Sequence, residues 1–131
     1  MKANELMIDD WVYNKNIDKP MQIYPMIFSQ MFRGKPAATT EDFNIFPIPL
    51  TTEIFEKNGF EKQWQDDCEY FDDDENLVIT FHPKSSNYTN GAYDYIDIEK
   101  GCLTINEMPI AFVHELQHAL RLCGIEKTIE L

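Results

Sequence analysis

The residues of this chain whose types and spacing suggest chemistry lie near its end, in the run His114-Glu115-Leu116-Gln117-His118. On a helix, residues four apart share one face, so two histidine rings at this spacing can bind one Zn²⁺. A glutamate directly after the first histidine can then activate a metal-bound water. The run therefore predicts a minimal zinc hydrolase, with His114 and His118 as metal ligands and Glu115 as general base.

Two observations on the same segment weaken the zinc interpretation. Arg121 lies one turn beyond the second histidine, and a fixed cation is unfavourable close to a dication. No third ligand is obvious either. The upstream candidate is His82, and the downstream candidates are Glu126 and Glu130.

The helix expected to carry these residues has a clear apolar face. It should begin near Pro109 and stop at about Cys123, before Gly124. At about 100° per residue its apolar side chains form one arc, and both histidines fall outside that arc. The arc consists of Phe112, Val113, Leu116, Ala119, Leu120 and Cys123. On this alternative interpretation His114, His118 and Arg121 form a candidate interaction surface on a packing helix, with no catalytic residue, metal or cofactor.

The whole chain of 131 residues predicts a single α+β domain with a β-rich part, 1–48, and a helix-meander-helix part, 49–131. In the first part, short runs of β-branched and aromatic residues are separated by Asn, Asp, Lys, Pro or Gly, which is typical of strands. These runs lie at 11–13, 21–24, 26–28 and 42–46. They indicate a small, strongly bent antiparallel sheet or barrel.

The second part begins with a short helix signal. Thr51 can cap its start, and Asn58-Gly59 can end it in a left-handed turn from which Phe60 folds back on the last turn. Apolar runs then follow at 68–71, 77–81, 92–98 and 102–105. They predict an antiparallel meander of three or four strands, on which the amphipathic last helix would pack.

Charge and composition exclude some functions. A formal net charge of -12 leaves no basic surface for nucleic acid phosphates, so we expect no direct nucleic acid binding. The first ten residues contain no apolar run, so we expect neither a signal peptide nor a membrane anchor, and a cytoplasmic location. Three widely spaced cysteines suit reduced thiols better than a disulfide framework. The oligomeric state stays open.

Three stretches resemble one known group of proteins. They are Met1–Leu6 followed by Trp11-Val12, Ile48–Thr51 with Asn58–Phe60, and Val113–Ile125. The sequence is similar there to a family of small uncharacterised proteins of Bacteroidetes bacteria and their phages, which has no established activity. The resemblance implies an SH3-like barrel for the first strands, although Asp9-Asp10 stands here in place of that family's Gly-Asn turn.

The resemblance also bears on the last helix. Relatives in that group commonly have Gln at the position of Glu115, and the position of His118 varies, which a zinc protease could not tolerate. Our leading hypothesis is therefore a non-enzymatic accessory or protein-interaction module that derives from a phage or mobile element and binds another protein. The zinc hydrolase is the first alternative. An acidic decoy that occupies the basic groove of a nucleic-acid-binding protein is the second.

Overall fold

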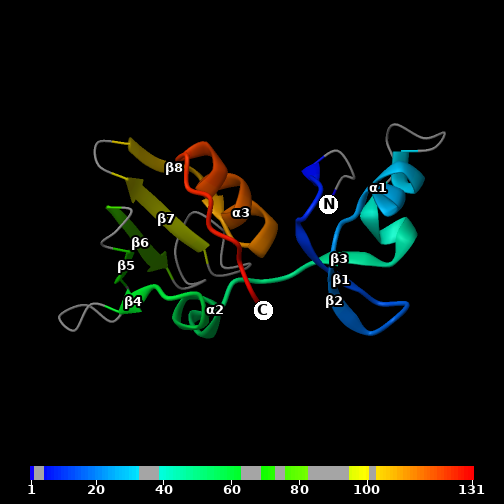
Figure 1. Cartoon of the computed structure of the whole chain (residues 1–131), viewed down its shortest axis with the longest axis horizontal. Coiled ribbons are helices and arrows are strands. Elements are labelled where there is room, and N and C mark those ends of the chain that lie inside the picture. Colours follow the sequence, from blue (N-terminus) through cyan, green and yellow to red (C-terminus); the bar gives the residue numbers. More distant parts are fainter. Residues whose placement is uncertain (2–4, 33–38, 63–68, 73–75, 83–94, 101–102) are drawn as a thin grey trace. The chain divides into compact units, whose positions relative to one another are not determined.

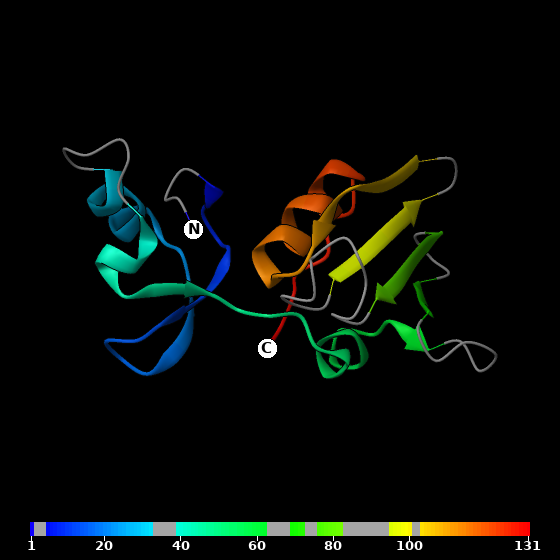
Figure 2. The same ribbon diagram turned by 180° about the vertical axis from the view of Figure 1, so that it is seen from behind.

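The computed structural model describes residues 1, 5–32, 39–62, 69–72, 76–82, 95–100 and 103–131. Helices and antiparallel sheets are both present, so the predicted α+β class is confirmed (Figures 1 and 2). The chain divides into two compact units, Met1–Ile48 (unit 1) and Pro49–Leu131 (unit 2). The boundary falls where the sequence predicts the change from the β-rich part to the helix-meander-helix part.

Unit 1 is built on a three-stranded antiparallel sheet in the order β2-β1-β3. The central strand β1 is Trp11–Asn14, and its neighbours are β2, Lys19–Gln22, and β3, Ile45–Pro47. Helix α1, Pro25–Phe32, and the 3₁₀ helix η2, Thr40–Phe43, lie between β2 and β3 in the chain. The SH3-like form of this unit stays a prediction.

The core of unit 1 is a small apolar cluster. Its buried members are Leu6, Val12, Ile23, Met31 and Ile45. Each large apolar side chain that is fully buried contributes roughly 1.5–3 kcal/mol relative to exposure. The cluster therefore joins β1, β3 and α1 to the segment that precedes β1.

The turn before β1 forms without the glycine that the resemblance leads one to expect. Asp9 takes the left-handed conformation itself, with φ of 72°, and Asp10 Oδ2 accepts a hydrogen bond from Met7 N at 2.7 Å. Two backbone hydrogen bonds connect the turn to the segment after β2. Asp9 N donates to Ile23 O at 2.8 Å, and Ile23 N donates to Asp10 O at 2.9 Å. Aspartate tolerates this conformation better than most residues do.

The predicted strand at residues 26–28 is wrong, because these residues belong to α1. Pro25 occupies the first helical position, which suits its fixed φ and missing N–H. Ile27 and Met31, four residues apart, both pack in the unit 1 core, as helical spacing requires. The predicted strand at 42–46 is correct only from Ile45, since Asn44, with φ of 56°, ends η2 first.

Unit 2 contains a five-stranded antiparallel sheet in the order β4-β5-β6-β7-β8. The strands are β4, Glu61–Lys62; β5, Glu69–Asp72; β6, Leu77–His82; β7, Tyr95–Lys100; and β8, Leu103–Ile110. The antiparallel meander is therefore present, and β4 makes it wider than predicted. The two views show α3, Val113–Leu122, beside β8 (Figures 1 and 2).

Helix α2, Thr52–Lys57, begins directly after Thr51 and ends before Asn58-Gly59, as predicted, although the Thr51 side chain forms no capping hydrogen bond with the described backbone. Gly59 adopts φ of 79° after the last turn, and Phe60 N donates to Phe55 O at 3.0 Å. The Phe60 ring folds back to meet the Phe55 ring edge-on, with 6.0 Å between centroids. Phe55 also contacts the Tyr70 ring, at 5.1 Å, so α2 is held against the sheet by aromatic packing.

The last helix begins later than predicted. Pro109 lies in β8, and the helical turns start only at Val113. Ile110 pairs with Ile96 of β7, and Leu50 N donates to Ala111 O at 2.9 Å, so this stretch is kept extended. The end of the helix agrees with the prediction, because Gly124 takes φ of 73° directly after the C-cap residue.

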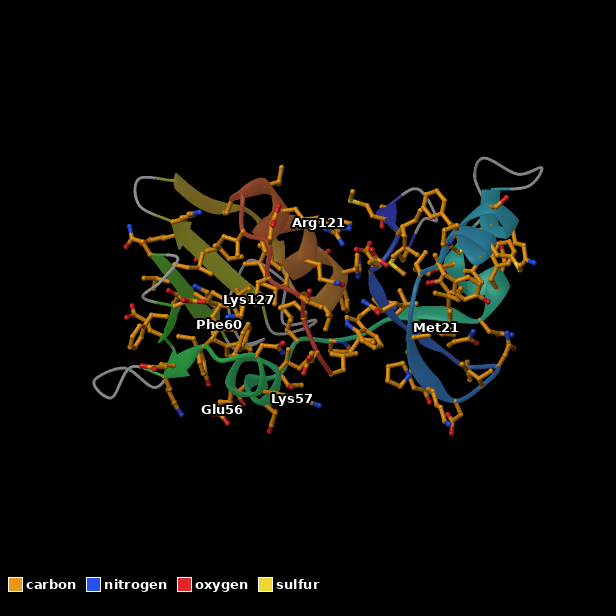
Figure 3. All side chains as sticks on the ribbon, in the orientation of Figure 1. Met21, Glu56, Lys57, Phe60, Arg121 and Lys127 are labelled. Carbon is orange, nitrogen blue, oxygen red and sulfur yellow. The ribbon has the colours of Figure 1, made fainter. Side chains whose placement is uncertain are left out.

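The segment after α3 is bound back onto α2 and β5. Asn58 Nδ2 donates to Glu130 O at 2.8 Å, and Asn58 Oδ1 accepts from Glu130 N at 2.7 Å. Lys127 Nζ lies 3.0 Å from Asp72 Oδ2 and 4.5 Å from the centroid of the Phe60 ring (Figure 3).

Among the described helices, none has the length and apolar character needed to cross a lipid bilayer.

We expect Asn58→Ala to destabilise unit 2 by about 2–3 kcal/mol, because it removes a buried carboxamide and leaves the backbone groups of Glu130 without these hydrogen bonds. Urea unfolding monitored by circular dichroism measures the loss as a lower midpoint at unchanged slope. The control is Glu56→Ala, which changes an exposed side chain of α2. Equal midpoints for the two variants would contradict the assigned role of Asn58.

Candidate functional site

The candidate site is the start and polar side of α3. The helix follows directly on the extended residues Ala111 and Phe112, whose backbone N–H groups have no partner within a helix. Glu115 Oε2 accepts a hydrogen bond from each, from Ala111 N at 2.8 Å and from Phe112 N at 3.1 Å. The carboxylate proposed as a general base is thus engaged as a helix cap, a role that its third position in the helix favours.

The two histidines of the run come together on α3. The centroids of the His114 and His118 rings are 5.8 Å apart, and the ring planes meet at 79°. Zinc binds histidine nitrogen at about 2.0–2.1 Å in a tetrahedral arrangement, which places two ligand rings roughly 5 Å apart. The spacing of the rings is thus close to that of a shared metal site.

The expectation that both histidines lie outside the buried arc is wrong for His114, whose residue is only 3% exposed. Its ring stacks on the Phe112 ring, with 6.1 Å between centroids and an angle of 11°. Gln117 is also buried. The helical projection misses this packing because it treats Phe112 as part of the helix, whereas Phe112 is the extended residue before the first turn.

The described residues do not complete a zinc site. Among them, no group of three or more His, Cys, Asp and Glu side chains is placed to hold a metal. The predicted upstream ligand, His82, has its Nε2 atom 2.8 Å from Asp97 Oδ2 within the sheet. The backbone of Glu130 bonds to Asn58, and Glu126 is exposed. None of the three predicted third ligands joins the histidine pair.

The predicted interaction surface is therefore accessible only in part. Arg121 is exposed and extends from α3 (Figure 3), His118 is partly buried, and His114 is buried. Leu122, next to Arg121, is 77% exposed. The accessible end of α3 is its last turn, not the histidine pair.

The thiol at the end of α3 lies in an environment that disfavours its reactive, ionised form. Burial raises the pKa of the Cys123 thiol, and the nearby charge of Lys100 offsets only part of that effect. Lys100 Nζ donates to the carbonyl oxygen of Cys123 at 2.9 Å. Since the thiolate is the nucleophilic form, Cys123 behaves as a small buried apolar residue. Cys68 and Cys102 lie outside the described residues.

Unit 1 carries an apolar surface that the sequence did not indicate. Met7, Ile8, Tyr24 and Met26 are exposed, and we call them the apolar patch. The backbone hydrogen bonds between Ile23 and the Asp9-Asp10 turn bring their two segments side by side. The alternation of apolar and polar residues cannot reveal such a patch, because its members come from a turn and from the start of a helix.

Comparison of the chain with known proteins finds no matching family model, no matching curated protein and no matching solved structure. Its function must therefore be argued from its own residues.

Replacement of the helix cap tests the role of Glu115. Glu115→Ala should lower the stability of unit 2 by about 1 kcal/mol, since capping side chains contribute roughly 0.5–2 kcal/mol. Hydrogen exchange at the amides of Ala111 and Phe112 should become faster in that variant. Glu115→Gln, which keeps a side-chain oxygen, should restore part of the protection. Unchanged exchange in Glu115→Ala would show that the cap is not formed in solution.

Proposed function

We propose that the protein is a non-enzymatic protein-interaction module and that it binds its partner through unit 1. The observation that carries this proposal is the apolar patch. Of the six large hydrophobic side chains that are exposed among the described residues, five belong to unit 1, and four of those form the patch. Single exposed apolar residues are common on protein surfaces, but a group of them rimmed by polar residues is typical of a binding surface.

The composition of the patch suits protein recognition. Tyr24 and Met26 are 47% and 65% exposed, and they lie two residues apart at the start of α1. Aromatic residues and methionine are enriched in protein interfaces. Methionine adapts to irregular surfaces, whereas tyrosine supplies a rigid apolar ring with a polar hydroxyl. The pair can therefore serve as the centre of an interface.

The chemistry of α3 supports a role without catalysis. A hydrolase built on His114 and His118 needs the Glu115 carboxylate beside the metal-bound water, yet this carboxylate binds the backbone at the start of the helix. It also needs a third ligand, and none of the described candidates lies with the histidines. On the proposed function, α3 is mainly a packing element.

A minimal zinc hydrolase remains the second candidate because of one observation. The 5.8 Å between the rings of His114 and His118 is a separation that a single metal ion can bridge. The two functions differ in measurable ways, because only the hydrolase needs a bound metal ion and the Glu115 carboxylate.

An origin in a phage or mobile element is part of the proposal and rests on the family resemblance. A cytoplasmic location is proposed from the N-terminal sequence, and a protein partner without direct nucleic acid binding from the net charge of -12. The acidic decoy hypothesis stays a prediction.

The interaction surface is tested by capture of partners from the cells that naturally express the chain. We expect Tyr24→Ser with Met26→Ser to reduce the captured partner at least about tenfold, as loss of interface anchors does. Leu122→Ser is the control, because it removes an even more exposed apolar side chain from unit 2. Equal loss in both variants, or in neither, would refute the proposed surface.

Metal analysis and an activity assay test the second candidate. Protein purified without a histidine tag should contain far less than one zinc per chain and should not hydrolyse casein or unstructured peptides. The matched variants are His118→Ala and Glu115→Gln, which should change neither result. A stoichiometric zinc that disappears in His118→Ala, together with hydrolysis that disappears in Glu115→Gln, would overturn the interaction proposal.

A further inference from the structure

Unit 1 also contains a cavity of about 240 Å³. Its polar lining consists mainly of carboxamides, from Asn14, Asn16, Gln30 and Asn44, and we call it the amide cavity. These residues come from the end of β1, the turn after it, α1 and the end of η2. The fold therefore gathers amide side chains from four places in the chain.

Hydrogen bonds hold three of these carboxamides in place. Asn44 Nδ2 donates to Asn16 Oδ1 at 2.8 Å, Asn16 Nδ2 donates to Phe43 O at 3.4 Å, and Asn14 Oδ1 accepts from Asn16 N at 2.9 Å. Among the described residues, the acceptor for Asn14 Nδ2 is the sulfur of Met21, at 3.1 Å (Met21 is labelled in Figure 3). A thioether is a weak acceptor. Within the described part of the chain, each of the three amide nitrogens thus retains a second N–H for a ligand.

Hydrogen bonds hold the backbone of Asn44 in place as well as its side chain. Asn44 has φ of 56° and ψ of 35°, and its N–H donates to the carbonyl oxygen of Glu41 at 2.9 Å. Its carbonyl oxygen accepts from Lys15 N at 2.9 Å. A side chain positioned in this way loses little conformational freedom when a ligand binds, which favours affinity.

The rest of the lining is apolar, except for one carboxylate. Ile27, Met31, Phe43 and Ile45 contribute the apolar surface, and Asp42 contributes the carboxylate. One oxygen of Asp42 already accepts a hydrogen bond from Thr39 N at 3.4 Å. The described lining contains no cationic side chain.

This lining selects among classes of ligand. An anion would meet a carboxylate and no cation, and a purely apolar ligand would leave the amides without hydrogen bonds. A primary amine could use Asp42, but it offers only donors, whereas carboxamides both donate and accept. A hydroxyl group both donates and accepts hydrogen bonds, as a carboxamide does, so a hydroxyl-rich ligand such as a sugar can pair with these side chains. The apolar C–H face of a sugar ring can also pack on the half-buried Phe43. The volume is below the range of roughly 300–1,000 Å³ that is usual for drug-sized ligands.

We propose that the amide cavity binds a small, neutral, hydroxyl-rich ligand of the size of one monosaccharide, with Asn16, Gln30 and Asn44 as its hydrogen-bonding residues. The inference is independent of the apolar patch and of α3. It adds a carbohydrate-binding site to the proposed interaction module.

NMR titration of the ¹⁵N-labelled full chain tests the proposal, with D-glucose, D-galactose and N-acetyl-D-glucosamine as separate probes. We expect at least one sugar to shift the side-chain amide signals of Asn16, Gln30 and Asn44 in a saturable way. n-Butylamine and acetate should produce no saturable shift at these signals. Saturation by either of these ions at lower concentration than by every sugar would overturn the ligand class, and no saturable shift with any of the three sugars would overturn the site.

Two substitutions make the test specific. Asn44→Gly removes the carboxamide but accepts the left-handed backbone, and it should raise the Kd for the sugar at least about tenfold, as loss of ligand hydrogen bonds does. Gln30→Ala, at an exposed position of α1, should raise the Kd in the same direction. The matched control is Asn76→Gly, which makes the same change at a left-handed position of unit 2, with φ of 50°. An unchanged Kd in both cavity variants, or an equal rise in Asn76→Gly, would refute the assignment.

Discussion

The arrangement of the elements in unit 2 depends on two hydrogen bonds between the carboxamide of Asn58 and the backbone of Glu130. Helix α3 has its apolar side against the sheet, but it is also held at both ends. At its start Glu115 binds the extended backbone, and after its end the returning segment is fixed to α2. Because a buried carboxamide without partners is costly, this connection favours one arrangement of the segment over others.

Much of the fold could be predicted from local patterns. The ending of helix α2 depends on Gly59 and Phe60, which are neighbours in sequence, and the strands of the meander depend on short apolar runs. The errors occur where contacts distant in the chain decide. Residues 26–28 have the composition of a strand, yet the spacing of Ile27 and Met31 toward the core makes them helical. Pro109 has the character of a helix start, yet pairing of Ile110 with Ile96 extends β8 past it.

The candidate site was predictable to a similar extent. Helical spacing alone indicates that His114 and His118 approach each other. It cannot indicate that Phe112 covers His114, or that Glu115 turns toward the backbone, because both depend on where the helix begins. The amide cavity was beyond prediction, since Asn14, Gln30 and Asn44 approach only when β1, α1 and η2 have packed.

The left-handed turns of this protein have a consequence for the substitutions that they tolerate. Asp9, Asp18, Asn44 and Asn76 all occupy left-handed positions where glycine is the usual residue. Glycine relieves the local strain but makes the unfolded chain more flexible, so its two effects on the free energy of unfolding oppose each other. Substitution by glycine can therefore keep these turns. Asn44 differs from the other three because it also lines the amide cavity. Glycine at this position would keep the turn but remove one of the carboxamides proposed to bind the sugar, so the same residue serves both the backbone and the cavity.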